Sequence, residues 1–241
     1  MGSKRLPGKV LRTVGGLPML QLQIERLKLS RLVDEIVVAT TTSASDDPVE
    51  ALCKKLGISC WRGAEFDVLS RVADLVHNHD AKIHVECFGD SPFVDPQLVD
   101  EFVGFILKNL HSFDFVSNTL STTYPPGLEV VVYRGETLIE TNLMVAADDP
   151  LREHVGYNIT RFPDIFRLKS LEAPPHFHWP NFSLEVDTIE DFEVISRVVE
   201  HFKKTGASYF SLSEIIAFMN EHPEVALHNQ HVHRRWKKLR N

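Results

Sequence analysis

The first nine residues, MGSKRLPGK, combine small residues with cations in a pattern that suits phosphate binding. Such a turn can direct backbone amides at an anion, and its cations can neutralise a polyphosphate. The spacing matches neither a Walker A loop nor a Gly-x-Gly-x-x-Gly motif. A basic N-terminal arm is the alternative interpretation. The candidate phosphate-binding residues are Gly2, Ser3, Lys4, Arg5 and Lys9.

Two aspartates each follow a stretch that is expected to be a strand. Asp90 follows the apolar stretch 82–88, and Asp187 ends the stretch SLEVD at 183–187. Ligands of open α/β sheets bind at the carboxyl ends of strands, so we expect these carboxylates to converge on one site. Magnesium takes one or two protein carboxylates plus phosphate oxygens, which makes both residues candidate ligands. A purely structural role for Asp90, shaping the turn before Pro92, is equally open.

The elements around these residues alternate between strand-like and helix-like patterns. Short β-branched runs predict strands at 35–40, 58–62, 82–88, 113–119, 128–134 and 183–187. Apolar stripes with capping residues predict helices at 17–29, 48–56, 67–76, 95–110 and 188–204. Asp95 is expected to cap one of these helices, and Thr188 with Asp191 forms a pattern like a capping box. This rhythm predicts an α/β fold with a mainly parallel sheet and helices on both sides.

Composition narrows the class of protein. The 241 residues carry a net charge of -7, which argues against a general nucleic-acid binder. No apolar run is long enough for a membrane span, so we expect neither nucleic acid nor membrane as a partner. Three widely spaced cysteines suit a reducing compartment, and we expect a cytoplasmic protein.

The order of the motifs resembles a known family. The sequence is similar to the spore-coat-polysaccharide-F type of cytidylyltransferases, relatives of the 3-deoxy-manno-octulosonate and acylneuraminate cytidylyltransferases. The resemblance runs from Met1 to about His201. It implies a three-layer, Rossmann-like nucleotide-diphospho-sugar transferase fold. The motifs that carry it are MGSKRLPGKVL, DEIVVATTT, DDP, RGAEFDVLSR, GDSPFVDP, DFVSNTL, TYPPGLEV, REHV and VDTIEDFE.

The resemblance implies a reaction and a role for each matching residue. A sugar hydroxyl would attack the α-phosphorus of CTP, releasing pyrophosphate and leaving a CMP-sugar for surface polysaccharide. The implied catalytic residues are Arg5, Lys9, Asp90 and Asp187, with Mg²⁺ held by the two aspartates. Ser3, Arg5 and Lys9 would hold the triphosphate, and Asp67 and Arg71 would lie near the nucleotide. The implied sugar-side residues are Tyr124, Glu129, Arg152, Glu153 and His154. A general base is not visible, and relatives are often homodimers.

The resemblance also suggests a division of the chain. Residues 1–205 are expected to form the cytidylyltransferase-like domain, with a sugar-side or dimerisation insertion at 121–175. Residues 206–241 are expected to form a helical extension and a basic, solvated tail. The tail histidines His228, His231 and His233 lack acidic or cysteine partners nearby in sequence, so we expect no metal site there.

Several positions depart from the family pattern. The family's hydrophobic first strand, ending in Gln-Ala-Arg, is absent before the loop; we expect a start site assigned too late or a truncation, with a native deletion as the alternative. Glu86 stands where the family usually has arginine, Phe88 replaces a small polar residue, and Glu129 replaces aspartate. Two other functions therefore stay open. One is a catalytically impaired nucleotide- or sugar-binding homologue, and the other is a glycosyltransferase of the related fold.

Overall fold

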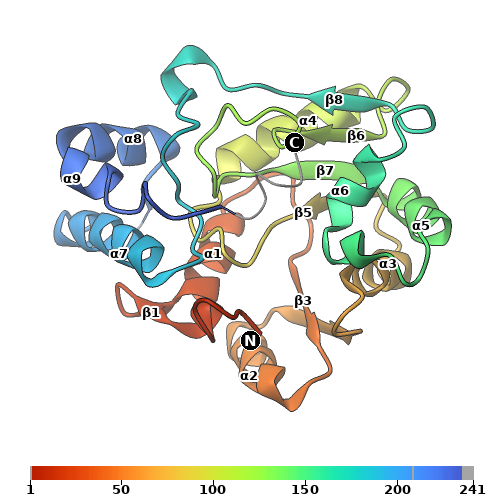
Figure 1. Ribbon diagram of the computed structural model, residues 1–241, viewed down its shortest axis with the longest axis horizontal. Helices are drawn as coiled ribbons and strands as arrows, with labels where there is room; N and C mark the ends of the chain where they lie inside the picture. Colours follow the sequence, from red (N-terminus) through yellow and green to blue (C-terminus); the bar gives the residue numbers. More distant parts are fainter. Residues whose placement is uncertain (1, 208, 235–241) are drawn as a thin grey trace.

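The structure is a computed structural model that describes residues 2–207 and 209–234. Figure 1 shows its helices and strands. The strands are β1 (Thr13–Val14), β2 (Leu17–Pro18), β3 (Val37–Thr41), β4 (Ser59–Gly63), β5 (Ile83–Glu86), β6 (Phe115–Ser117), β7 (Val131–Arg134) and β8 (Leu168–Ser170). The α-helices are α1 (Met19–Leu27), α2 (Asp47–Leu56), α3 (Val68–Asn78), α4 (Pro96–Lys108), α5 (Gly135–Met144), α6 (Val155–Thr160), α7 (Ile189–Lys204), α8 (Leu212–Glu221) and α9 (Pro223–Ala226). Short 3-10 helices are η1 (Lys9–Leu11), η2 (Ala44–Asp46), η3 (Pro150–Glu153) and η4 (Pro175–Phe177).

Within the described residues, the strands form three sheets. β1 and β2 make a small hairpin, and β3 pairs in parallel with β4. The four-stranded sheet has the order β5-β7-β6-β8, in which β7 is antiparallel to both neighbours and β8 is parallel to β6. The α/β fold is thus confirmed, but the sheet is mixed where the sequence suggested a mainly parallel one. The reason is that a loop, rather than a crossover helix, joins β6 to β7, so the chain turns back on itself.

Three expected helix ends are confirmed, but the helix expected at 17–29 begins only at Met19, because Leu17 and Pro18 form β2. The Asp95 carboxylate accepts hydrogen bonds from the backbone N–H groups of Gln97 and Leu98, which caps α4. Thr188 and Asp191 form a capping box at the start of α7. Gly57 ends α2 with a φ of 65°, a left-handed conformation that glycine adopts at little cost. Within the described residues, no helix is both long enough and apolar enough to cross a membrane.

One expected strand is absent from the structure, and others are shorter than expected. The stretch 183–187 is not a strand among the described residues, although its backbone forms hydrogen bonds with two loops. The Leu184 N–H donates to the Pro126 carbonyl, and the Val186 N–H donates to the Asp90 carbonyl at 2.8 Å. Both partners lie in loops, so single hydrogen bonds take the place of a ladder. The strand expected at 128–134 begins only at Val131.

Among the described residues, three apolar clusters hold the layers together, and two of them lie against the four-stranded sheet. The larger cluster joins α4, α7 and α8 to the sheet, and its fully buried members include Phe102, Ile106, Val132, Ile195 and Ile215. The second cluster packs α3, α5 and α6 against the sheet, with Leu69, Val76, Tyr133, Leu138 and Ile159. Figure 1 shows α7 to α9 on the left and α3, α5 and α6 on the right, with α4 near the top between them. The C-terminal helices α8 and α9 therefore share the main core.

Candidate active site

Lys9 is the centre of a cluster that joins three distant segments. Its ammonium lies 2.8 Å from an Asp90 carboxylate oxygen, 2.8 Å from the Val186 carbonyl and 3.2 Å from an Asp187 carboxylate oxygen. Burial lowers the pKa of Lys9, but the two carboxylates outweigh it and the net shift is upward. The side chain therefore stays charged near neutral pH and holds the opening loop against both acidic segments.

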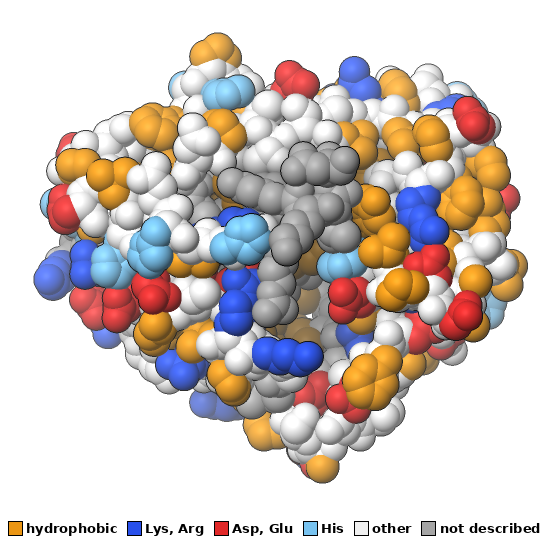
Figure 2. Space-filling model, viewed as in Figure 1, with side chains coloured by type: hydrophobic (Ala, Val, Ile, Leu, Met, Phe, Trp, Pro, Cys, Tyr) orange, Lys and Arg blue, Asp and Glu red, His pale blue; other side chains and the backbone are white. Residues whose placement is uncertain are grey.

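Arg5 brings a second cation to the same cluster. Its guanidinium forms an ion pair of 2.5 Å with Asp187 and also donates to the His233 carbonyl at 3.2 Å. Two cations, Arg5 and Lys9, thus balance the two carboxylates of Asp90 and Asp187. Figure 2 shows lysine and arginine side chains gathered near the N-terminus on this face, beside a hollow in its middle.

The backbone places Asp90 and Asp187 side by side. Asp90 lies four residues after the end of β5, in the turn that leads to Pro92. Asp187 lies directly before the cap of α7, and its own N–H donates to the Asp191 carboxylate at 2.9 Å. The side chains of Asp90 and Asp187 are 34% and 17% exposed, so both can reach a ligand. The structure thus brings together all four residues to which the sequence assigned catalysis.

The rest of the opening loop is arranged around this cluster. The Ser3 hydroxyl accepts a hydrogen bond from the Leu6 N–H, which folds the loop back on itself. Gly8 has a φ of 67° and turns the chain into η1, which begins at Lys9. Gly2 and Lys4 are exposed.

A second group links a predicted nucleotide residue to a predicted sugar residue. The Asp67 carboxylate accepts from the Ser70 N–H, capping α3, and forms an ion pair of 2.9 Å with Arg152. Arg152 is buried and also donates to the Val145 carbonyl and the Asn142 side chain. Arg71 donates to the Ala64 carbonyl, which braces the loop between β4 and α3. The guanidinium groups of Arg71 and Arg152 therefore already donate hydrogen bonds to oxygen atoms of the protein.

The remaining sugar-side residues lie in different settings. Tyr124 is buried, and burial raises the pKa of its hydroxyl to about 12. The Glu129 carboxylate accepts from the Gly127 N–H. Gly127 has a φ of 99°, and a Cβ there would lie 2.4 Å from the backbone of Leu184. The segment carrying Tyr124 and Glu129 thus packs closely against the stretch that leads to Asp187. Glu153 and His154 form a pair of 3.2 Å at the surface.

Sequence reasoning missed three residues that support the cluster. Asp191 was expected only as a helix cap, but its fully buried carboxylate also binds Asn229 and Arg234. Arg234 lies in a stretch that was expected to be a solvated basic tail, and it is only 5% exposed. This part of the expectation is wrong, because the guanidinium has a buried carboxylate as its partner. The rest of the tail, 235–241, lies outside the described residues.

The Asp67 pair allows a direct test of its two contributions. Asp67→Ala should lower the free energy of unfolding by about 2–3 kcal/mol, because both the helix cap and a partner of buried Arg152 are lost. Asp67→Asn should cost about 1 kcal/mol less, because asparagine caps helices as well as aspartate does. Urea denaturation of both variants measures the difference. Equal losses would show that the cap contributes nothing.

The fold and the cluster together define a class of protein. An α/β fold that presents a cationic loop to two carboxylates is suited to a transferase acting on a nucleotide polyphosphate. The sequence matches the cytidylyltransferase family over residues 1–235. This chain belongs to the cytidylyltransferase family.

Individual relatives agree with this assignment. The chain is 33% identical over 231 residues to the spore coat polysaccharide biosynthesis protein SpsF of Bacillus subtilis, covering 94% of this chain and 93% of that protein. It is 26% identical to the 3-deoxy-manno-octulosonate cytidylyltransferase of Solibacter usitatus, covering 81% and 90%. A solved cytidylyltransferase from Leptospira borgpetersenii superposes with a TM-score of 0.88 at 28% identity, covering 97% of this chain and 95% of that one. The resemblance read from the motifs is confirmed.

Proposed function

We propose that the enzyme transfers CMP from CTP to a hydroxyl of a sugar or sugar acid, releasing pyrophosphate, in the biosynthesis of a surface polysaccharide. The observation that carries this proposal is the cluster of Arg5, Lys9, Asp90 and Asp187, in which a cationic loop faces two carboxylates from distant segments. The names of the relatives support a sugar acceptor, since they include a polysaccharide biosynthesis protein and a cytidylyltransferase for an eight-carbon sugar acid.

The residues of the cluster fit a magnesium ion. Asp90 and Asp187 offer hard oxygen donors that converge on one point, now bridged by the Lys9 ammonium. In the described part of the chain, no group of three or more His, Cys, Asp and Glu side chains could hold a metal alone. This suits an ion that takes one or two carboxylates and completes its shell with phosphate oxygens and water. When bound, magnesium would neutralise phosphate charge at this edge.

The protein's own cations would act on the phosphates. In the transfer, the acceptor hydroxyl oxygen forms a bond to the α-phosphorus, and the bond to the bridging oxygen breaks with its electrons leaving on pyrophosphate. Arg5 and Lys9 would bind the β- and γ-phosphates and stabilise the charge that develops there. Before CTP arrives, Asp90 and Asp187 hold both cations at this edge through ion pairs. We assign no residue to accept the hydroxyl proton.

The group formed by the Asp67–Arg152 ion pair would separate the nucleotide subsite from the sugar subsite. Arg152 is buried and bonded to Asp67, Asn142 and Val145, so we assign it to hold this group together rather than to touch the substrate. Glu153 and His154 stay accessible for sugar hydroxyls. Arg71, like Arg152, would support the nucleotide side through the loop that it braces. A homodimer and a cytoplasmic location are proposed from the family resemblance alone.

The experiment that tests the function measures pyrophosphate release from CTP with a panel of acceptors. The panel should contain eight- and nine-carbon sugar acids and neutral hexoses, each with and without Mg²⁺, and mass spectrometry should identify the product. We expect a CMP-sugar from at least one acceptor, only with the metal present. Binding of CTP without turnover on any acceptor would favour the catalytically impaired homologue instead.

A further inference from the structure

The segment after α9 returns to the active site. It runs back across the face of the molecule toward the centre (Figure 1). Arg234 forms a bidentate pair with Asp191, at 3.0 and 2.6 Å. Asn229 adds a hydrogen bond of 2.7 Å to the same carboxylate and one to the Ser183 carbonyl. The Asp191 carboxylate is fully buried, and Arg234 is 5% exposed.

Asp191 also contacts the backbone of Asp187, the candidate metal ligand. One carboxylate oxygen of Asp191 accepts the N–H groups of Asp187 and Thr188, each at 2.9 Å. The Asp187 side chain then points to Arg5 and Lys9. A chain of direct contacts therefore runs from Arg234 through Asp191 to the backbone of Asp187. The orientation of that backbone decides where the Asp187 carboxylate lies.

The same segment also supports the opening loop. The His233 carbonyl accepts a hydrogen bond from Arg5 at 3.2 Å. Arg5 also forms an ion pair with Asp187, which Arg234 supports through Asp191. Two neighbouring residues, His233 and Arg234, therefore support both members of this ion pair. The two ends of the described chain thus meet at the site.

A guanidinium suits this position better than other side chains do. Its planar fork can bind both oxygens of Asp191 at once, which fixes the rotation of the carboxylate. A lysine would supply a point charge and leave that rotation less restricted. Glu185 lies 3.4 Å from Arg234 as a further acidic neighbour.

We propose that Arg234 is a positioning residue of the transferase, which acts through Asp191 to hold the Asp187 carboxylate in place for the metal–nucleotide complex. This inference rests on the proposed function, because it assigns Asp187 to that complex. It adds a residue from outside the motifs of the opening loop and the two aspartate turns.

A double-mutant cycle on CTP binding tests the link. Calorimetry should measure the affinity for CTP with Mg²⁺ in wild type, Arg234→Met, Asp187→Asn and the double variant. We expect Arg234→Met alone to weaken binding at least tenfold, but to change it less than twofold in the Asp187→Asn background, because residues acting in series are not additive. Equal losses in both backgrounds would overturn the proposal. Arg234→Lys should fall between wild type and methionine, and provides the test if Arg234→Met does not fold.

His228→Ala is the matched control. His228 anchors the same segment, but through a surface pair with Glu193 at 2.6 Å. We expect its CTP affinity to stay within twofold of wild type. A loss as large as that of Arg234→Met would show that docking of the whole segment matters, and not the contact with Asp191.

Hydrogen exchange gives a readout that needs no nucleotide. Because the N–H groups of Asp187 and Thr188 donate to Asp191, Arg234→Met and Arg234→Lys should speed their exchange at least tenfold, while amides of Val194 and Val198 inside α7 keep their rates. Unchanged exchange at Asp187 and Thr188 would overturn the positioning role. If the wild type does not bind CTP, the proposed function fails, and exchange alone then decides whether Arg234 positions Asp187.

Discussion

Asp90→Asn is expected to lower kcat/KM for CTP by a factor of about 10²–10³, because it removes one of the two carboxylates that the proposed function places beside the reacting phosphates. Asparagine keeps the shape of the side chain but loses the charge that magnesium requires. The fold should persist, since the Asp90 side chain is one-third exposed and Lys9 keeps its contacts with Val186 and Asp187. Initial rates of pyrophosphate release over a range of Mg²⁺ concentrations measure the effect.

A control variant separates this effect from a general loss of negative charge. Asp74→Asn removes one carboxylate from the exposed face of α3 and should leave kcat/KM within twofold of wild type. Asp90→Asn should also need more Mg²⁺ to reach half of its maximal rate. An Asp90→Asn enzyme with wild-type activity and metal requirement would remove Asp90 from the site.

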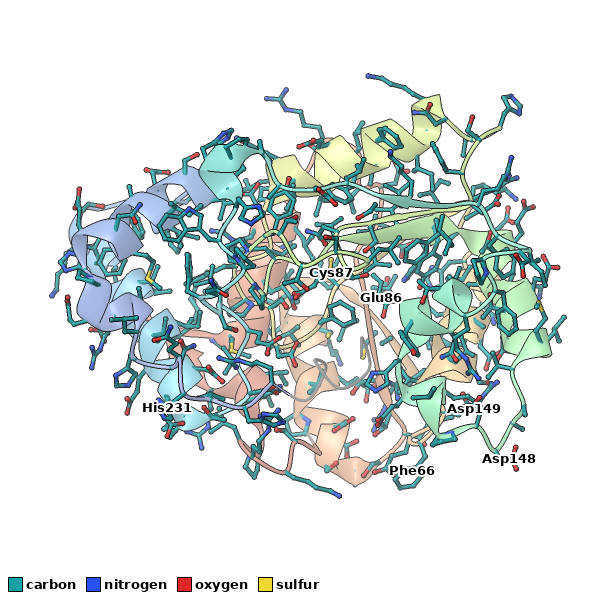
Figure 3. The ribbon with its side chains drawn as sticks, turned by 45° about the horizontal axis from the view of Figure 1, so that its top comes forward. Phe66, Glu86, Cys87, Asp148, Asp149 and His231 are labelled. Carbon is teal, nitrogen blue, oxygen red and sulfur yellow. The ribbon has the colours of Figure 1, made fainter. Side chains whose placement is uncertain are left out.

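Glu86→Gln is expected to stabilise the protein above neutral pH by about 3 kcal/mol. Glu86 ends β5 in the interior, next to Cys87 (Figure 3). Burial raises its pKa to about 7, although the Gly156 N–H and the Tyr133 hydroxyl donate to its carboxylate. A pKa difference of about 2.5 between the folded and unfolded states corresponds to about 3 kcal/mol. Glutamine keeps an acceptor oxygen for both donors without the buried charge.

The sign of the pH dependence follows from proton binding. Between about pH 4.5 and 7 the folded state holds the Glu86 proton while the unfolded chain has lost it. The contribution of Glu86 to stability is therefore full below about pH 4.5 and is lost as pH rises through 7. The variant should match wild type near pH 4 and exceed it near pH 8.

Chemical denaturation at several pH values checks this result. The difference between wild type and variant isolates Glu86 from other groups that titrate in the same range, such as the half-buried His84. Glu140→Gln, on the exposed face of α5, should show no such pH-dependent difference. A constant difference between wild type and Glu86→Gln from pH 4 to 8 would contradict the raised pKa. A pKa confirmed near 7 would explain how the interior tolerates this carboxylate, because it can stay protonated below neutral pH.

Local signals in the sequence were sufficient for much of the fold. The caps at Asp95 and Thr188 and the helix end at Gly57 depend on neighbouring residues, so they could be read directly. The convergence of Asp90 and Asp187 was expected from strand ends, yet in the structure the residues that precede Asp187 are not a strand. The two aspartates still lie side by side, because the Val186 N–H donates a hydrogen bond to the Asp90 carbonyl.

Features that depend on distant partners could not be read in the same way. Arg234 stands among cations in the sequence, and only the fold shows that it is buried against Asp191. Likewise, the ion pair between Asp67 and Arg152 spans most of the middle of the chain, and no local pattern predicts it. The direction of β7 in the sheet is a third example, because similar β-branched runs serve parallel and antiparallel strands.

The central claim is that this chain binds CTP through a metal-dependent site at Asp90 and Asp187. Calorimetric titration of the wild type with CTP, UTP, ATP and GTP, each with and without Mg²⁺, tests it most directly. We predict that CTP binds at least tenfold more tightly than the other nucleotides, and that removing Mg²⁺ or introducing Asp187→Asn abolishes most of this affinity. Equal binding of CTP in the presence of a chelator, or by Asp187→Asn, would contradict the account.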